Sequence, residues 1–434
     1  ASTAWSRAAG RPAEQVDKII VEGGRRLSGE VEVSGAKNAA LPLIFASLLT
    51  DRPCRLRGLP EVADIRTALG LLEHMGAQVE RSGSEATIDC SRLAETEAPY
   101  DLVRTMRASF LTLGPLLARF GKARVSRPGG CAIGSRPVDV HVAAMAALGA
   151  RVEEEAGYIE ARSGRLRASH VILEKPSVGA TENLMMAASL AEGTTRVENA
   201  AREPEITDLA KALAAMGAGI SGAGSSVIEV EGVERLGGFD HDVIPDRIEA
   251  GTFLIAGAIT RGDLSVRGAR AGDLGALLEA LRASGCLVDE LEGAVRVSAD
   301  GPLRPVDIRT APYPGFATDL QAQFMALMCT ASGRSVITEA VFENRFMHVS
   351  ELARMGADIR LSGHQAEVGG AAELAGAPVM ATDLRASVCL VLAGLAAAGR
   401  TEISRVYHLD RGYERIEEKL GSVGARIERR PVQG

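Results

Sequence analysis

Aromatic residues and basic runs are scarce in this chain of 434 residues. Phe, Trp and Tyr make up 3% of it, so the core must consist mainly of Ala, Leu, Val and Ile, which suits closely packed helices and strands. No run of basic residues is present, and the formal net charge is −7. We therefore expect no nucleic-acid partner, and we expect any anion site to be a local cluster of cations.

Signatures of metal binding and of membrane insertion are also missing. The six cysteines occur without a CxxC pair and the seven histidines without HxxxH or HExxH, which argues against zinc and for a reducing compartment. The longest apolar run, 387–399, is too short to span a bilayer. Residues 1–17 lack the apolar block of a signal peptide and are expected to form a flexible extension. These features predict a cytoplasmic protein that does not bind membranes.

The chain does contain a sixfold internal repeat. A helix-like segment ends in glycine and continues into a strand-like segment six times, with spacings of 73, 68, 68, 71 and 68 residues between Gly76, Gly149, Gly217, Gly285, Gly356 and Gly424. Each glycine suits the left-handed residue that ends a helix. A helix of small residues and a β-branched strand come earlier in each unit. We therefore predict the order helix, strand, helix, strand, strand, in a module of α/β type rather than a solenoid repeat.

Polar residues recur where the first helix of each unit begins. We expect Asp246, Thr318 and Thr382 to act as N-caps of their helices. Lys37 and the arginines at equivalent positions cannot be caps, and a cation is disfavoured at the positive end of a helix dipole. If these helix starts converge, the cations indicate an anion-binding pocket.

Arginines also recur in the loops that follow the first strand of a unit, at Arg136, Arg202, Arg345 and Arg411. A single such arginine is usually a solvated surface charge, but the recurrence favours a shared site. These cations suit a ligand that carries phosphate and carboxylate groups, which a guanidinium binds with two parallel hydrogen bonds. The chain has no GxxxxGK[ST] loop and no DxD cluster, so we do not expect metal-dependent phosphoryl transfer.

A thiol and a carboxylate are the candidates for proton transfer. Cys131 lies among glycines in RPGGCAIGSRPVD (127–139), which predicts a loop, and the flanking Arg127 and Arg136 would favour its thiolate. Asp319 lies at a helix start and could accept a proton. Each has a simpler alternative, because a single cysteine is often an inert apolar residue and an aspartate at this position is often a helix cap.

Ten segments carry a resemblance to a known family: SGAKNAALP, YDLVRTMRASF, GGCAIGSRPVD, KPSVGAT, AAREPEI, PDRIEAGTF, TDLQAQF, FENRFMH, TDLRAS and DRGYERIE. Over residues 18–430 the chain resembles the enolpyruvyl transferase family, in its branch that acts on UDP-N-acetylglucosamine. The resemblance implies a two-lobed inside-out α/β barrel of six βαβαββ repeats, three in each lobe, with helices inside and sheets outside. It implies that residues 18–36 and 245–434 form lobe I, and that residues 37–244 form lobe II with the cysteine loop.

The resemblance also implies a reaction, in which the enolpyruvyl group of phosphoenolpyruvate moves to the 3′-hydroxyl of the nucleotide sugar and phosphate is released. No metal and no cofactor is implied. Cys131 would be the proton donor and Asp319 the base, with Lys37 and Arg411 as further catalytic groups. The expected phosphoenolpyruvate contacts are Lys37, Asn38, Arg136, Arg345, Arg385 and Arg411. The expected contacts to UDP-N-acetylglucosamine are Arg107, Arg136, Pro137, Val138, Asp139, Val140, Lys175, Pro176, Ser177, Val178, Asp319 and Val341.

Two alternatives stay open at this point. The chain could be a catalytically silent paralogue that senses nucleotide sugars, or an enolpyruvyl transferase with a different nucleotide acceptor. In all three cases the partners are small molecules. Because the sequence shows no extended apolar interface, we expect a monomer.

Overall fold

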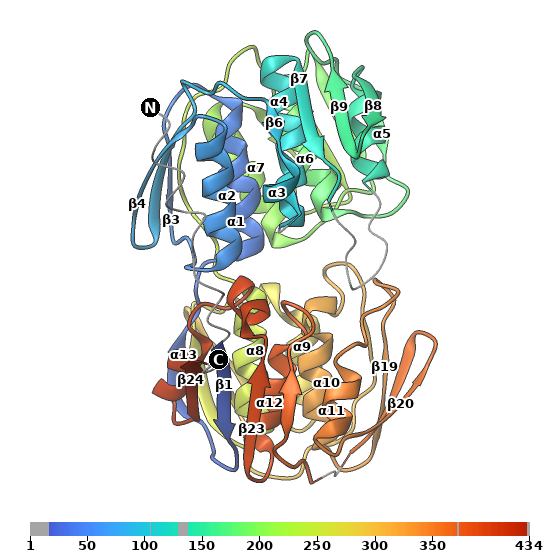
Figure 1. Cartoon of the computed structure of the whole chain (residues 1–434). Coiled ribbons are helices and arrows are strands. Elements are labelled where there is room, and N and C mark those ends of the chain that lie inside the picture. Colours follow the sequence, from blue (N-terminus) through green and yellow to red (C-terminus); the bar gives the residue numbers. More distant parts are fainter. Residues whose placement is uncertain (1–16, 105, 129–137, 371–372, 432–434) are drawn as a thin grey trace.

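The structure is a computed structural model that describes residues 17–104, 106–128, 138–370 and 373–431. The chain forms two lobes, one above the other in Figure 1, with strands on the outside and the longer helices inside. The expected extension lies outside the described residues except for Asp17, which begins a strand.

Among the described residues, the strands form six four-stranded sheets with one common pattern. In every sheet the first two strands are parallel, and the third and fourth follow in antiparallel order. The sheets of lobe II, in spatial order, are β14 (Asp240–Asp242), β3 (Cys54–Arg57), β5 (Glu85–Asp89), β4 (Gln78–Ser82); β6 (Glu97–Ala98), β7 (Lys122–Ser126), β9 (Tyr158–Arg162), β8 (Arg151–Glu155); and β10 (His170–Ile172), β11 (Thr194–Glu198), β13 (Val227–Glu231), β12 (Gly219–Ser221). Those of lobe I are β2 (Ser28–Glu32), β15 (Asp263–Arg267), β17 (Ala294–Ser298), β16 (Leu287–Leu291); β18 (Ile308–Arg309), β19 (Arg334–Thr338), β21 (Gln365–Gly369), β20 (Asp358–Ser362); and β22 (Pro378–Met380), β23 (Arg400–Ser404), β1 (Asp17–Glu22), β24 (Arg426–Pro431).

Each sheet comes with one inner and one outer helix, and this confirms the predicted repeat and fold class. The inner helices are α1 (Lys37–Ala46), α4 (Leu113–Phe120), α6 (Val178–Ala188), α8 (Arg247–Ile259), α10 (Gln321–Cys329) and α12 (Val388–Ala396). The outer helices are α2 (Ala63–His74), α5 (Asp139–Ala147), α7 (Pro204–Met216), α9 (Gly275–Ala283), α11 (Val349–Arg354) and α13 (Ile416–Ser422). Shorter elements are α3 (Tyr100–Val103) and the 3₁₀ turns η2 (Ser47–Leu49), η3 (Arg107–Thr112), η4 (Ala271–Asp273), η5 (Thr318–Leu320) and η6 (Val406–Arg411).

The six glycines of the repeat end the outer helices as predicted. All six have left-handed backbone angles, with φ between 90° and 112°. In each unit the next residue donates its N–H to the carbonyl five residues earlier, as Ala77 does to Leu72 over 2.9 Å and Ala425 to Leu420 over 3.1 Å. This backbone pattern is the Schellman motif, and it turns the chain from helix into strand six times.

The inner helices explain the scarcity of aromatic residues. All nine residues of α10 are buried, and α8, α10 and α12 pack against one another. Small residues also let α8 approach its other neighbours closely: a Cβ added at Gly251 would lie 2.8 Å from Leu277 Cδ2 of α9, and one at Gly257 would lie 2.8 Å from Val297 Cγ1 of β17. None of the helices in the described ranges combines the length and apolarity needed to cross a bilayer.

The chain crosses between the lobes twice, at one place. Strand β2 belongs to a sheet of lobe I but leads into α1 of lobe II, and β14 of lobe II leads into α8 of lobe I. The two crossing segments pair through an antiparallel bridge between Gly35 and Pro245, with a hydrogen bond of 2.7 Å from Ala36 N to Ile244 O. The first turns of α1 and α8 are therefore held together at the junction of the lobes.

Candidate active site

The first turn of α8 is capped as the sequence predicts. Asp246 Oδ1 accepts hydrogen bonds from the backbone N–H groups of Ile248 at 2.8 Å and Glu249 at 3.1 Å. Its second carboxylate oxygen remains available to another group. The capping aspartate thus serves both the helix and the site beside it.

The predictions that Thr318 and Thr382 are caps are wrong. The Thr318 hydroxyl donates instead to Glu339 Oε2 over 2.8 Å, a charged and therefore stronger acceptor. After Thr382, Asp383 stabilises the turn that precedes α12, because its Oδ1 accepts from the N–H of Arg385 at 2.6 Å. At this position the carboxylate of Asp383, and not the hydroxyl of Thr382, accepts the backbone N–H.

Lys37 and Arg411 share one carboxylate across the lobes. Lys37 begins α1, and its Nζ lies 3.0 Å from Oδ2 of Asp64 in the first turn of α2. Arg411, at the end of η6 in lobe I, donates from Nε to Oδ1 of the same residue over 2.8 Å. Burial alone would raise the pKa of Asp64, but the two cations outweigh it and hold the pKa below its usual value.

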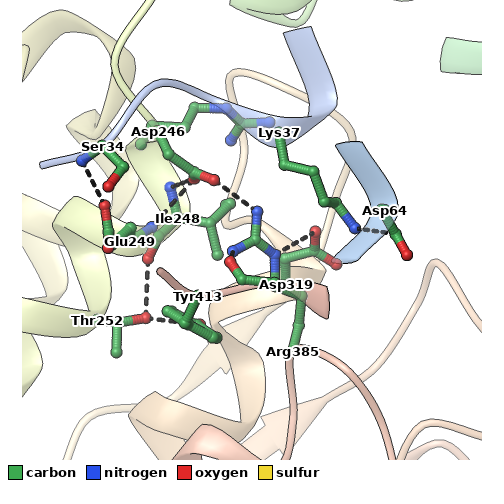
Figure 2. A network of polar contacts seen from close by, with 12 residues as sticks. Ser34, Lys37, Asp64, Asp246, Ile248, Glu249, Thr252, Asp319, Arg385 and Tyr413 are labelled. Atoms are coloured by element: carbon green, nitrogen blue, oxygen red, sulfur yellow. Dashed lines mark hydrogen bonds and ion pairs between the residues drawn. The ribbon is translucent and has the colours of Figure 1, made fainter. Parts of the chain in front are cut away.

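Arg385 lies at the centre of a second group of contacts, beside those of Lys37, Asp64 and Arg411 (Figure 2). Its guanidinium is buried and donates to Asp246 Oδ2 and to the carbonyl of Gly412, both at 2.7 Å. Gly412 follows Arg411 in the chain, so this hydrogen bond from Arg385 also fixes the backbone next to Arg411. Burial would lower the pKa of Arg385, but Asp246 and other neighbours outweigh it and raise the pKa above its ordinary value.

Asp319 meets two arginines. Its Oδ1 accepts a hydrogen bond of 2.6 Å from Arg345 Nη2, and its Oδ2 lies 4.0 Å from Arg385 Nε. Burial would lower the pKa of Arg345, but Asp319 and the nearby acids outweigh it and raise the pKa. Two fixed cations therefore surround the carboxylate that the sequence suggests as a base.

Glu339 stabilises the loops on either side of Asp319 through hydrogen bonds. It is buried, and its Oε1 accepts from Thr310 Oγ1 at 2.9 Å and from the backbone N–H of Val341 at 2.8 Å. Its Oε2 accepts from Thr318, which in turn accepts from Arg345 Nη1 at 2.9 Å. The buried carboxylate of Glu339 thus positions two expected site residues. It acts on Asp319 through Thr318 and on Val341 through a direct hydrogen bond.

These contacts form one continuous network at the lobe junction. It runs from Lys37 through Asp64, Arg411 and Arg385 to Asp319 and Arg345. The structure therefore brings together most of the cations expected at phosphoenolpyruvate, and Asn38 follows Lys37 in the first turn of α1. A shallow cavity beside the crossing segments is lined by Lys37, Asp246 and Gly412, among others.

The residues expected to contact the nucleotide sugar lie in both lobes. In lobe II, α5 begins at Asp139 and packs against α6, where Gly179 approaches His141 so closely that an added Cβ would lie 3.2 Å from the ring. Val138 to Val140 and Lys175 to Val178 thus flank neighbouring helix starts, and Arg107 begins η3, which also packs on α6. In lobe I, Asp319 and Val341 stand on the loops that Glu339 holds.

Three expected site residues, Cys131, Arg136 and Pro137, lie outside the described residues. The five described cysteines are Cys54, Cys90, Cys286, Cys329 and Cys389, and all are buried. Burial raises the pKa of each, to about 12 for Cys54 and Cys329 and to about 11 for Cys90. These five thiols are therefore poor nucleophiles.

Sequence reasoning missed Asp64 and Glu339 and overvalued Arg202. Asp64 is in the LPEVADIR loop, where a single acid in the first turn of an outer helix resembles an ordinary helix-start residue. Arg202, in an equivalent loop, is exposed and donates to the carbonyl of Gly224, as a surface arginine does. Within the described parts of the chain, no group of three or more His, Cys, Asp or Glu side chains is arranged to hold a metal ion.

Comparisons with known proteins give consistent results. A family model described as EPSP synthase (3-phosphoshikimate 1-carboxyvinyltransferase) matches residues 21–420. The UDP-N-acetylglucosamine 1-carboxyvinyltransferase of Anaeromyxobacter sp. (strain Fw109-5) is 58% identical over 419 residues, covering 95% of this chain and 99% of that relative. The protein of the same name from Desulfatibacillum aliphaticivorans is 57% identical over 414 residues, covering 95% of this chain and all of that relative.

Solved structures share the fold. The enolpyruvyl transferase NikO from Streptomyces tendae superposes with a TM-score of 0.86 at 28% identity, covering 96% of this chain and 100% of that one. EPSP synthase from Acinetobacter baumannii superposes with a TM-score of 0.74 at 20% identity, over 96% and 100% of the two chains.

Proposed function

Because this chain belongs to the EPSP synthase family of enolpyruvyl transferases, and within it to the UDP-N-acetylglucosamine 1-carboxyvinyltransferases, we propose that it joins phosphoenolpyruvate to UDP-N-acetylglucosamine. The enolpyruvyl group moves to the 3′-hydroxyl of the sugar and phosphate is released. This reaction is the first committed step of peptidoglycan synthesis. The full-length similarity supports it over a silent sensor and over a different acceptor.

The network of cations at the lobe junction is the observation that carries this proposal. Lys37, Arg345, Arg385 and Arg411 are four cations in one chain of contacts, and Asp319 stands among them. Phosphoenolpyruvate brings a phosphate and a carboxylate, which such a set of donors binds without a metal ion. Fixed cations also stabilise the negative charge that develops as phosphate leaves, because they need no reorganisation during the reaction.

The reaction requires that C3 of phosphoenolpyruvate gain a proton and that the 3′-hydroxyl of the sugar lose one. When C3 of the enol gains a proton, C2 becomes electrophilic, and the 3′-hydroxyl oxygen attacks it while losing its own proton. The tetrahedral intermediate then expels phosphate and gives up a proton from C3, which restores the double bond. We assign the acceptance of the hydroxyl proton to Asp319 and the donation to C3 to Cys131, which lies outside the described residues.

We assign the remaining contacts by lobe. Arg107, Arg136 to Val140 and Lys175 to Val178 would hold the nucleotide sugar on lobe II, taken as residues 37–244, and Asp319 and Val341 would meet it from lobe I, taken as residues 18–36 and 245–434. The two paired crossing segments would serve as the hinge on which nucleotide-sugar binding brings the lobes together.

We propose further that the protein acts as a monomer in the cytoplasm. Its exposed large apolar side chains are spread over different sheets, Ile172, Leu287 and Leu361 among them, which supports a monomer. The five described cysteines are unpaired, as expected for a protein kept in a reducing compartment.

A phosphate-release assay with both substrates tests the function. We expect one phosphate and one molecule of nucleotide sugar enlarged by an enolpyruvyl group per turnover, and no phosphate when either substrate is omitted. Binding of the nucleotide sugar without turnover would instead show a sensor. Turnover with another nucleotide but not with UDP-N-acetylglucosamine, in a panel of acceptors, would show a different transferase.

A further inference from the structure

Asp64 contacts cations from both lobes in the network of the candidate site. One of its carboxylate oxygens accepts from Lys37 of lobe II at 3.0 Å, and the other accepts from Arg411 of lobe I at 2.8 Å. Only 6% of its side chain is exposed, as is 6% of that of Lys37, while Arg411 remains 30% exposed. The carboxylate is thus enclosed between two cations, and the guanidinium is the more accessible of the two.

The geometry leaves donors free for a ligand while Asp64 stays in place. A lysine ammonium has three N–H donors and a guanidinium has five, and the contacts with Asp64 use the Nζ of Lys37 and the Nε of Arg411. The remaining donors of both side chains can therefore face a phosphate group. Asp64 also lowers the local charge, because Lys37 and Arg411 supply two positive charges and Asp64 removes one.

On the basis of the proposed function, we propose that Asp64 is a positioning residue that orients Lys37 and Arg411 across the lobe junction and weakens their hold on phosphate. Turnover requires that the site bind the phosphate of phosphoenolpyruvate and then let inorganic phosphate go. Two uncompensated cations in a buried site would retain a divalent anion. A fixed carboxylate within hydrogen-bond distance of both prevents this, and it keeps both donors aimed at the same place.

Charge and position can be separated by two substitutions. Asp64→Asn keeps the size of the side chain and removes its charge, and Asp64→Glu keeps the charge and moves it by one methylene. Binding of inorganic phosphate, measured by calorimetry without any substrate, reports the charge effect. Steady-state kcat with both substrates reports the positioning effect.

For Asp64→Asn we expect phosphate to bind at least about tenfold more tightly, because the positive charge of Lys37 and Arg411 is no longer compensated. We also expect kcat to fall at least about tenfold, because phosphate release slows and the two cations are no longer oriented. For Asp64→Glu we expect phosphate affinity to stay within about threefold of the parent while kcat falls at least about tenfold. The matched control is Asp101→Asn, a highly exposed acid of lobe II, which should change neither quantity.

Phosphate affinity that is unchanged or weaker in Asp64→Asn would overturn the proposal. If this variant does not fold, as judged by circular dichroism, Asp64→Glu decides, and either unchanged kcat or a tenfold gain in phosphate affinity would then overturn it. The calorimetric result does not depend on turnover. A chain that binds phosphate as expected but never releases it from phosphoenolpyruvate would therefore refute the proposed function and leave the role of Asp64 in anion binding intact.

Discussion

Arg345 holds Asp319 by a hydrogen bond of 2.6 Å from Nη2 to Oδ1, and the two side chains differ in exposure, at 4% and 25%. The buried partner fixes the carboxylate, and the carboxylate remains accessible. A general base needs both properties, because it must be positioned by the protein and reached by the substrate. This relationship distinguishes Asp319 from a helix cap, the simpler interpretation of the sequence.

Replacing Asp319 by asparagine removes the proposed proton acceptor and preserves the size of the side chain. We expect kcat to fall by about 10²- to 10⁴-fold, the usual contribution of general-base catalysis. Binding of the nucleotide sugar, measured by calorimetry, should weaken far less. The control is Asp300→Asn, an acid with an 88% exposed side chain, which should retain parental kinetics. A variant at position 319 that keeps more than about a third of the parental kcat would contradict the assignment.

The cysteines should differ sharply in reactivity. Burial raises the pKa of all five described thiols, so they should resist alkylation in the folded protein at neutral pH. We therefore expect fosfomycin, an epoxide analogue of phosphoenolpyruvate, to add once, at Cys131, and Cys131→Ser to prevent the addition. Intact mass and peptide mapping measure both results. A label found on Cys54 or Cys389 in the native protein would count against this account.

The crossing segment requires glycine at position 35. An added Cβ would lie 1.8 Å from the carbonyl oxygen of Gly58, so the crossing segment would have to move away from the backbone at Gly58. We expect Gly35→Ala to lower the free energy of unfolding by about 2 kcal/mol or more. The control is Gly70→Ala in the interior of α2, where an added Cβ meets nothing within 4 Å. That change should raise the free energy of unfolding by about 0.5–1 kcal/mol, and equal effects of both substitutions in urea denaturation would refute the prediction.

Burial of His348 should make the free energy of unfolding depend on pH. Burial lowers the pKa of His348 to about 4, with Asp383 opposing and Arg345 assisting the shift. An unfolded histidine binds its proton near pH 6.5, so between pH 6.5 and about 4 the unfolded state holds more protons than the folded state. The stability contribution of the neutral ring is complete above pH 6.5 and is lost as the pH falls.

The variant His348→Gln cannot titrate at this position. Its stability should therefore depend less on pH than that of the parent, by up to about 1.4 kcal/mol per pH unit between pH 6 and 4.5. Urea denaturation at several pH values measures the slope. Identical slopes for His348→Gln and the parent would contradict the prediction.

The repeat was predictable from sequence because it depends on local backbone chemistry. The six glycines end their helices through the left-handed conformation, and no long-range contact is needed to specify that geometry. The third and fourth strands of the final sheet were harder to assign, because β1 comes from the start of the chain and pairs with β23 and β24 at its end. The pairing of the crossing segments likewise joins residues about two hundred positions apart.

The site was only partly predictable for a similar reason. Lys37, Arg345, Arg385 and Arg411 are noticeable in the sequence, because cations at helix starts and in equivalent loops need an explanation. Their partner Asp64 is not, since an acid in the first turn of a helix is ordinary and its contact with Arg411 joins residues 347 positions apart. Thr318 is not a cap because its hydroxyl donates to the buried Glu339, and next to Thr382 it is Asp383 that accepts a backbone N–H group.

The most direct measurement of the central claim is a crystal structure with UDP-N-acetylglucosamine and phosphate bound together. The account predicts the sugar 3′-hydroxyl within about 3.2 Å of the Asp319 carboxylate and the phosphate on Lys37 and Arg411. A nucleotide sugar whose 3′-hydroxyl points away from Asp319, with phosphate held elsewhere, would contradict it.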